Sequence, residues 1–175
     1  MTYLQFHTRL RWSIPVSLAF ACAIAAADDS PPPVKVDWTD PSAFAEVRQN
    51  ACRNRVKPEE WLGELARHMQ RRAGKVIAAG QHLDVTLTDI RRAGACEPWR
   101  GPQWDDVRVV KEIYSPRIDL RYTLTTADGK LVRSGEATLR DAAFISRATA
   151  TRDDDPLRYE KRMLDDWLRR EFTPG

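Results

Sequence analysis

The sequence predicts an α+β fold, a two-layer sandwich in which helices pack on one face of a mixed or antiparallel sheet of about four strands. Two long segments carry apolar residues at the spacing of a helix face, and shorter segments alternate apolar and polar residues as strands do. Their order along the chain is strand, helix, helix, three strands and a final helix. Strands that follow one another, rather than alternating strictly with helices, are typical of α+β domains.

The first three elements are predicted in the amino-terminal half of the chain. Val34–Trp38 alternates apolar and polar residues, as a half-buried strand does. Asp40 and Pro41 are a helix cap and a first-turn proline, and they predict a short helix. The next helix is predicted from Pro58 to Gly80, where the glycine ends it. Its buried face is predicted to contain Trp61, Leu62, Leu65, Met69 and Val76.

The remaining strands are predicted as His82–Ile90 and a hairpin. Ile118–Thr126 and Leu131–Leu139 flank Asp128-Gly129, a dipeptide typical of two-residue hairpin loops. Such a loop sets every pairing of the two strands, and the resulting partners match in character on each face of the sheet. The predicted pairs are Ile118 with Leu139, Leu120 with Ala137, Tyr122 with Gly135, Arg121 with Glu136 and Thr123 with Ser134.

The same register places Arg117 opposite Arg140. Like charges directly opposed in a sheet repel each other, so we expect the two side chains to splay apart at frayed strand ends. The alternative is that they share an anion such as phosphate, sulfate or a substrate carboxylate. Arg117 and Arg140 are therefore candidate binding residues.

The last helix is predicted to begin with Asp155 as its cap and Pro156 in its first turn. Its apolar face is formed by Leu157, Met163, Leu164, Trp167, Leu168 and Phe172. Glu160 falls inside this face, where an unpaired carboxylate would be costly to bury. We expect Glu160 to form a buried ion pair with Arg108 or Arg140, and a catalytic acid is the alternative.

Residues 1–27 have the three parts of an export signal: a start with two arginines, a short apolar run, and alanines before an acidic pair. We predict cleavage after Ala27, a flexible leader over residues 28–33, and a single domain over residues 34–175. The predicted location is periplasmic or secreted, with no transmembrane segment in the mature chain. Lipidation at Cys22 is a less favoured alternative, since the aliphatic residue usual three positions earlier is missing.

The charge balance argues against a nucleic-acid partner. The chain has 28 basic and 25 acidic residues, but the predicted signal contains two arginines and no acid, which leaves 26 against 25. A nearly neutral chain without a basic stripe is not expected to bind nucleic acid. The partner is unknown, and an envelope protein, a peptide or a glycan are the kinds that an exported module could meet.

Two cysteines remain after the predicted cleavage, Cys52 and Cys96. In an oxidising compartment an even pair of cysteines most simply forms a disulfide. Two free buried thiols are the alternative.

The loop from Cys96 to Trp104, CEPWRGPQW, holds much aromatic surface in a stretch that cannot form a regular element. Trp99, Arg100 and Trp104 on a proline-stiffened loop could stack a sugar ring, grip a peptide or anchor a protein partner. The favoured interpretation is that both indoles pack on the edge of the core, because large aromatic side chains are usually buried.

No pattern of a nucleophile elbow, a zinc protease or a phosphate-binding loop is present in the chain. His68 and His82 lack the companion spacing of a metal pair, so we interpret both as exposed or satisfied side chains. Asp153–Asp155 could suggest a divalent cation, but adjacent carboxylates seldom converge on one ion, and negative charge is favoured where a helix begins. We therefore predict no metal and no cofactor.

Three stretches of the sequence are distinctive when taken together. They are LTDIRRAG (Leu87–Gly94), PRIDLRYTL (Pro116–Leu124) and LRYEKRMLDDW (Leu157–Trp167). Their order and spacing resemble a family of exported bacterial proteins known as domain of unknown function 3016, over about Val34–Phe172. The resemblance implies an envelope location in Gram-negative bacteria, and it implies no activity and no catalytic residues.

The leading hypothesis is a non-catalytic binding or accessory module of the cell envelope. An alternative is a hydrolase acting on an envelope polymer, with Glu160, or Asp84 and Asp89, as its carboxylates and the tryptophans as subsites. A third possibility is a purely structural envelope protein.

Overall fold

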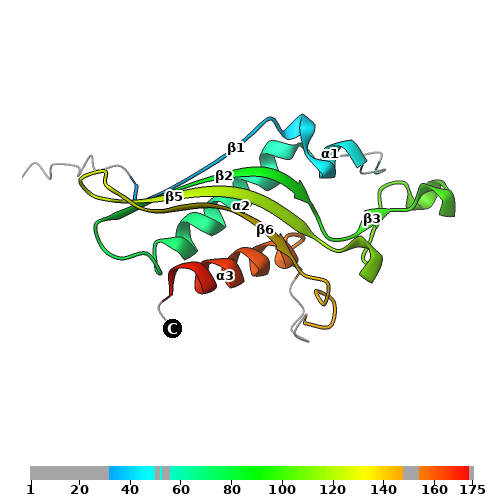
Figure 1. Ribbon diagram of the computed structural model, residues 1–175. Helices are drawn as coiled ribbons and strands as arrows, with labels where there is room; N and C mark the ends of the chain where they lie inside the picture. Colours follow the sequence, from blue (N-terminus) through cyan, green and yellow to red (C-terminus); the bar gives the residue numbers. More distant parts are fainter. Residues whose placement is uncertain (1–31, 50–51, 53–55, 148–153, 174–175) are drawn as a thin grey trace, which may run out of the picture. The chain divides into compact units, whose positions relative to one another are not determined.

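The centre of the molecule is a four-stranded sheet with the strand order β1-β2-β5-β6 (Figure 1). The computed structural model describes residues 32–49, 52, 56–147 and 154–173, so the predicted signal peptide lies outside the described residues. The strands are β1 (Val34–Trp38), β2 (Gln81–Arg91), β5 (Arg117–Thr126) and β6 (Leu131–Arg140). Because β1 runs parallel to β2 while the other neighbours are antiparallel, the sheet is mixed.

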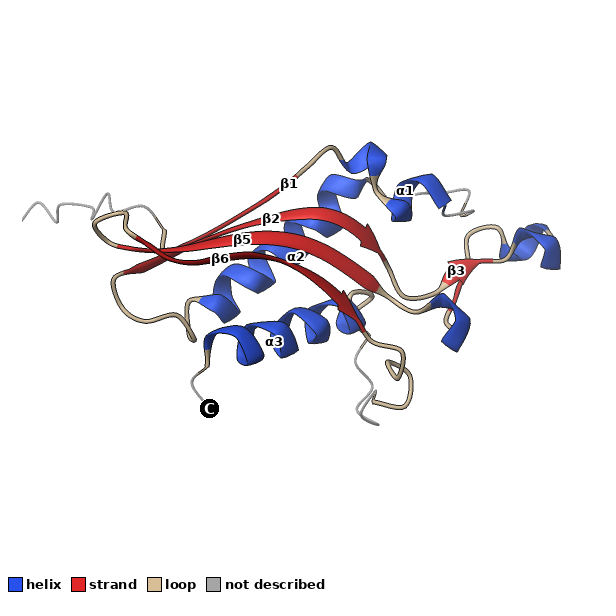
Figure 2. Cartoon of the chain, viewed as in Figure 1, coloured by secondary structure: helices blue, strands red, loops and turns tan. Residues whose placement is uncertain are grey.

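Two long helices pack side by side on one face of this sheet (Figure 2). They are α2 (Pro58–Ala73) and α3 (Arg158–Phe172). A 3-10 turn, η1 (Pro41–Ala43), and the short helix α1 (Ala45–Gln49) follow the end of β1. The predicted α+β sandwich is therefore confirmed. None of the helices among the described residues is both long and apolar enough to cross a bilayer.

The core lies between the sheet and the two long helices. The inward side chains of the central strands are buried, as strict alternation requires: Leu83, Val85 and Leu87 on β2 are at most 2% exposed. The apolar stripe of α3 meets them, and Tyr122, Trp167 and Phe172 pack edge to face with ring centroids 5.4 to 5.7 Å apart. The other sheet face carries mostly threonines and charged residues.

The predicted hairpin register is confirmed from Arg117 to Leu124, but the predicted loop is wrong. Gly129, at φ 80°, donates to the Thr126 carbonyl, and Thr126 in turn pairs with Lys130, which makes the loop one residue longer. A bulge between Leu124 and Thr125 restores the register beyond the loop. The longer loop follows from Asp-Gly forming a turn with only the glycine left-handed.

Two predicted helix boundaries are also corrected. The second helix ends at Ala73 with Gly74 as its C-cap, and Gly80 instead precedes β2 with φ 77°. Val76 still packs against the core, because further turns continue its spacing after the helix has ended. At the start of α3, the Asp155 carboxylate accepts a hydrogen bond from the Leu157 N–H at 2.8 Å, so it caps the turn before the helix.

Residues 95–115, called the arm from here on, extend beyond the end of the sheet between β2 and β5 (Figure 1). The arm has a small antiparallel ladder of β3 (Ala95–Cys96) and β4 (Arg108–Val109). Three 3-10 turns complete it: η2 (Pro98–Arg100), η3 (Pro102–Trp104) and η4 (Glu112–Tyr114). Strands of two residues have no detectable period, which is why sequence patterning missed them.

Candidate functional site

The arm is fastened to the rest of the chain by a disulfide. Cys52 and Cys96 are bonded, with their Cα atoms 5.0 Å apart, so the predicted pair is confirmed. Gly94 stands at the root of the arm with φ 79°, and a Cβ there would lie 2.9 Å from the Val109 carbonyl. Only glycine allows this close approach of the two arm strands. A structural disulfide is typical of oxidising compartments, which is consistent with a location outside the cytoplasm.

A buried carboxylate braces the arm from within. Glu97 is 1% exposed and accepts hydrogen bonds from Lys111 Nζ at 2.6 Å and from the Tyr114 hydroxyl at 2.9 Å. Arg100 Nε lies 3.2 Å from its second oxygen. The hydrogen bond from Lys111 holds the pKa of Glu97 below its usual value. The carboxylate therefore stays charged and joins the segments that follow β3 and β4.

The two tryptophans of the arm have different surroundings. Trp99 is 71% exposed, so the interpretation that both indoles pack on the core is wrong for this residue. Trp104 is half-buried, and the Arg100 guanidinium lies 4.6 Å from its ring centroid. Arg100 thus covers Trp104 and pairs with Glu97, which makes it a brace of the arm. Of the two tryptophans, Trp99 is therefore the one whose ring is open to a partner.

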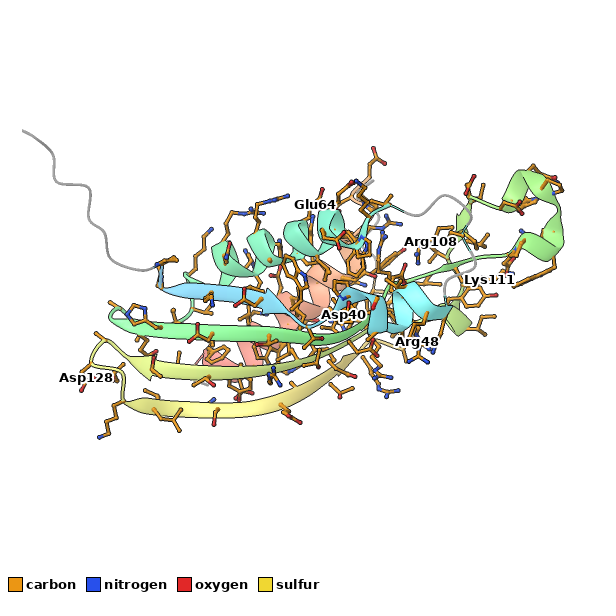
Figure 3. The ribbon with its side chains drawn as sticks, turned by 90° about the horizontal axis from the view of Figure 1, so that it is seen from above. Asp40, Arg48, Glu64, Arg108, Lys111 and Asp128 are labelled. Atoms are coloured by element: carbon orange, nitrogen blue, oxygen red, sulfur yellow. A yellow bond between two sulfur atoms is a disulfide. The ribbon has the colours of Figure 1, made fainter. Side chains whose placement is uncertain are left out.

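Arg108 stands at the root of the arm, next to the amino-terminal helices (Figure 3). Its guanidinium donates to the carbonyls of Ala93 and Gly94 at 3.1 and 2.7 Å. It also pairs with the Glu46 carboxylate of α1. Glu46 in turn accepts the Arg92 backbone N–H at 2.9 Å, so α1, the end of β2 and the arm are tied together.

The predicted ion pair of Glu160 with Arg108 or Arg140 is wrong. Glu160 is fully buried, as expected, but one carboxylate oxygen accepts the Ala93 N–H at 2.6 Å and the other has no hydrogen-bond partner among the described residues. Arg108 is occupied by Glu46 instead, because the arm brings it to α1. Burial raises the pKa of Glu160, and the hydrogen bond and the Arg92 charge oppose this only in part.

Of the two facing arginines at the end of β5 and β6, Arg117 is paired with carboxylates. Arg117 does pair with Arg140 in the ladder, and the strand ends are not frayed. Arg117 Nε lies 3.1 Å from both oxygens of Asp119, and a second nitrogen lies 3.2 Å from Asp89. Its hydrogen bonds lower the pKa of Asp119. These carboxylates offset the charge of Arg117.

The three stretches that carry the family resemblance meet at this end of the sheet. Asp89, from the first stretch, accepts the Ala45 N–H at 2.7 Å and pairs with Arg117 of the second. Ala93, also from the first stretch, donates to Glu160 of the third. These polar contacts lie where the arm begins, in addition to the strand pairing of β2 with β5 and the packing of Tyr122 on Trp167 in the core.

Two clefts open beside this junction, and Glu46 and Arg92 line both of them. The larger, here called the Trp61 cleft, has a volume of about 280 Å³. Its apolar wall is formed by Val47, Val56, Pro58, Trp61 and Pro156. The smaller, of about 220 Å³, lies toward Arg91, Ile113 and Tyr114.

The other sequence candidates lie apart from the clefts. His68 is hydrogen-bonded to Asp165 at 2.9 Å, which makes it a satisfied side chain. Asp155 of the acidic run is a cap, while Asp153 lies outside the described residues. Within the described part of the chain no three potential ligands are grouped as a metal site.

The carboxylates of the hydrolase alternative are not brought together as a reactive pair. Asp84 is exposed in the middle of β2, whereas Asp89 is held by Arg117 and the Ala45 N–H. Glu160 is fully buried and cannot meet a polymer without rearrangement.

Comparison with known proteins identifies the family. The sequence profile described as "Protein of unknown function (DUF3016)" matches residues 32–170. No curated protein and no solved structure matches the chain significantly. Since the profile spans most of the chain and includes all three distinctive stretches, the protein belongs to the DUF3016 family.

Proposed function

We propose that this protein is an exported, non-catalytic binding module that docks on another component of the cell envelope through its arm. The amino-terminal segment supports export, with cleavage after Ala27 and release into the periplasm or beyond. The Cys52–Cys96 disulfide supports the same compartment, because such bonds persist where the environment is oxidising.

The exposure of Trp99 is the observation that carries the proposal. An indole that is 71% exposed gains nothing for folding and adds apolar surface that must be solvated. Tryptophan is also the residue type most enriched among the side chains that dominate binding energies. The disulfide and the Glu97 contacts already hold the arm in place, so a partner would meet an ordered surface and lose little entropy.

Further apolar side chains on the arm favour a macromolecular partner. Ile113 is 74% exposed and Val107 is 43% exposed, which makes the arm rich in open apolar surface. Separate apolar anchors on a projecting element suit a protein, peptide or glycan chain better than a compact small molecule.

Site-specific photo-crosslinking in the intact cell tests the proposal. A benzoyl-phenylalanine at position 99 should yield a discrete adduct on irradiation. The matched control is the same probe at Leu131, which is 58% exposed at the opposite end of the sheet, next to the Asp128 loop (Figure 3). Adducts at 99 and none at 131 would support the proposal. Equal labelling at both positions, or none at 99, would contradict it and favour a purely structural protein.

The hydrolase alternative is less well supported. Retaining and inverting glycosidases both need two carboxylates that face each other across the scissile bond. Asp89 is occupied by Arg117 and Glu160 is shielded from solvent, so neither is placed to act on a polymer.

A further inference from the structure

The Arg92 side chain, which lies where the arm meets α1 and the end of β2, makes no hydrogen bond to any described residue. Its backbone N–H donates to Glu46, but its guanidinium donates to no acceptor in the part of the chain that the structure describes, and its Nε is shielded from solvent. Its neighbour Arg108 has three acceptors, two carbonyls and the Glu46 carboxylate. An unpaired guanidinium held against the protein interior is costly, and an anion is the partner that would offset this cost.

The position of the Arg92 side chain directs it toward the Trp61 cleft. Its guanidinium carbon lies 5.7 Å from the centre of the Trp61 ring, so the planar group is held over the indole. Arg92 lines the cleft together with this indole. Among the three guanidinium nitrogens only Nε is shielded from solvent while lacking a partner. The two outer nitrogens are not shielded in this way, so they can donate hydrogen bonds to a ligand in the cleft.

The charges around Arg92 favour a ligand with a single negative charge. Glu46 is already shared between Arg108 and the Arg92 backbone, and its carboxylate would repel a dianion placed close by. Glu160 also acts on Arg92, but burial favours its neutral form. Glu64 acts on Arg92 as well, yet its side chain is half exposed, so water screens its charge. Asp106 lines the cleft as well, and its charge adds to the repulsion of a dianion. The three glutamates act on Arg92 from a distance and none accepts a hydrogen bond from its guanidinium among the described residues, which leaves that group open to one anionic ligand.

We propose that the Trp61 cleft binds a carboxylate attached to an apolar group, with the Arg92 guanidinium holding the carboxylate and the wall around Trp61 and Val56 covering the apolar part. A planar guanidinium matches a carboxylate through two parallel hydrogen bonds. The cleft volume of about 280 Å³ fits a ligand of small size, such as a short acid or the last residue of a peptide. This site is separate from Trp99 and does not depend on the docking role of the arm.

Titration of the full mature protein with matched acids and amides tests the site. The probes are hexanoate and hexanamide, which share the apolar chain and differ in charge, followed by ligand-observed NMR. Hexanoate should bind at least about 10-fold more tightly than hexanamide, which corresponds to about 1.4 kcal/mol. Acetate should bind more weakly than hexanoate, because it lacks the apolar part. Equal affinity for hexanoate and hexanamide, or no binding of hexanoate, would overturn the proposal without any variant being made.

The two sources of such a carboxylate are distinguished in a second titration. The tripeptide Ala-Ala-Leu with a free carboxyl terminus is compared with its carboxyl-terminal amide. If the free peptide binds more tightly than hexanoate and the amide does not bind, the ligand is a peptide terminus. If hexanoate is preferred, the ligand is a free organic acid. Both results support the cleft as a carboxylate site.

Substitutions of the neighbouring residues Arg92 and Arg91 provide a test variant and its matched control. Arg92→Gln should remove the preference for hexanoate over hexanamide, whereas Arg91→Gln should retain it, because Arg91 donates to the Ser115 carbonyl and lines the other cleft. Arg92→Gln should also melt no lower than the wild type, since it removes an unpaired buried charge. A clearly lower melting temperature together with an unchanged preference for hexanoate would show that Arg92 is a structural residue and would overturn the proposal.

Discussion

The sheet with its two helices and the arm are held together by different forces. The sheet and helices enclose a large apolar core in which side chains such as Leu65 and Leu164 are fully buried. In the arm, the buried residues are only Cys96 and Glu97. One of these is half of the disulfide, and the other is the carboxylate that joins Arg100, Lys111 and Tyr114.

This difference follows from size. An element as small as the arm cannot enclose enough apolar surface to offset its own conformational entropy, so it needs covalent and ionic staples. The sheet and helices also have ion pairs, but burial of apolar area stabilises them directly. The stability of the arm should therefore depend on reductant and acid. The stability of the sheet with its two long helices, called the body from here on, should instead depend on how completely its core is filled.

The largest effect is expected for a cavity in the body. Trp167 is 3% exposed and packs edge to face against Tyr122 and Phe172. Trp167→Ala should lower the free energy of unfolding by about 3–5 kcal/mol, because the cavity and the lost burial add together. Urea denaturation measures this change. Leu131→Ala, at a site that is 58% exposed, is the control and should change it by less than about 0.5 kcal/mol.

Removal of the disulfide should have the next largest effect and should act mainly on the arm. Cys52 and Cys96 are 44 positions apart, and a cross-link of this span stabilises by about 2–4 kcal/mol. In the double variant Cys52→Ser and Cys96→Ser, hydrogen exchange should accelerate in residues 95–115 before it does so in β2 and β5. Equal acceleration in the arm and the sheet would contradict the distinction between the two regions.

Glu160, the buried acid of the body, should make the protein less stable as the pH rises. Burial raises the pKa of Glu160, so its stabilising contribution is complete at low pH and is lost as the pH rises toward the folded-state pKa. Glu160→Gln keeps an acceptor for the Ala93 N–H and does not ionise. Its melting temperature relative to the wild type should therefore increase from about pH 4 upward. A difference that stays constant with pH would contradict this assignment.

Glu97, the buried acid of the arm, should have the opposite effect and make the arm less stable as the pH falls. The hydrogen bond from Lys111 lowers the pKa of Glu97, so its contribution is complete at neutral pH and is lost as the pH falls through the folded-state pKa. The protection factors of the arm amides, which correct for the intrinsic exchange rate at each pH, should fall below about pH 4 in the wild type. In Glu97→Gln the arm should already exchange faster at pH 7 and should respond less to acid. Equal protection of the arm in the wild type and in Glu97→Gln would contradict the stabilising role of Glu97.

The smallest effect on stability is expected at the tip of the arm. Because Trp99 is 71% exposed, Trp99→Ala should change the free energy of unfolding by less than about 0.5 kcal/mol. Trp104→Ala, which removes the stacking surface of Arg100, is the comparison and should cost more. A large loss of stability in Trp99→Ala would mean that the indole serves the fold rather than a partner.

The parts of the fold that were predictable from the sequence are those governed by local periodicity. The buried face of α2 and the hairpin pairs from Ile118 to Thr123 were right, since each follows from side-chain spacing along one or two neighbouring segments. The hairpin loop was wrong by one residue, because Asp-Gly is compatible with more than one turn type.

The candidate site was less predictable, because its contacts join segments far apart in the chain. Glu160 was expected to be buried, and it is, but its partner is the Ala93 N–H rather than an arginine. Arg92 gave no sequence signal, since an unpaired guanidinium can be recognised only once all its neighbours are placed. A buried charge or a satisfied arginine depends on three-dimensional surroundings that no spacing encodes.

The sequence by itself determined the α+β class, the covalent pair Cys52–Cys96 and the family, because these depend on period, composition and motif order. Only the tertiary structure decided that Trp99 is exposed, which acids pair with Arg117, and that the Arg92 guanidinium has no acceptor among the described residues. Each of these depends on how the arm meets α1 and the end of the sheet. Contacts between distant segments are set by packing and charge in three dimensions, where local propensity has no influence.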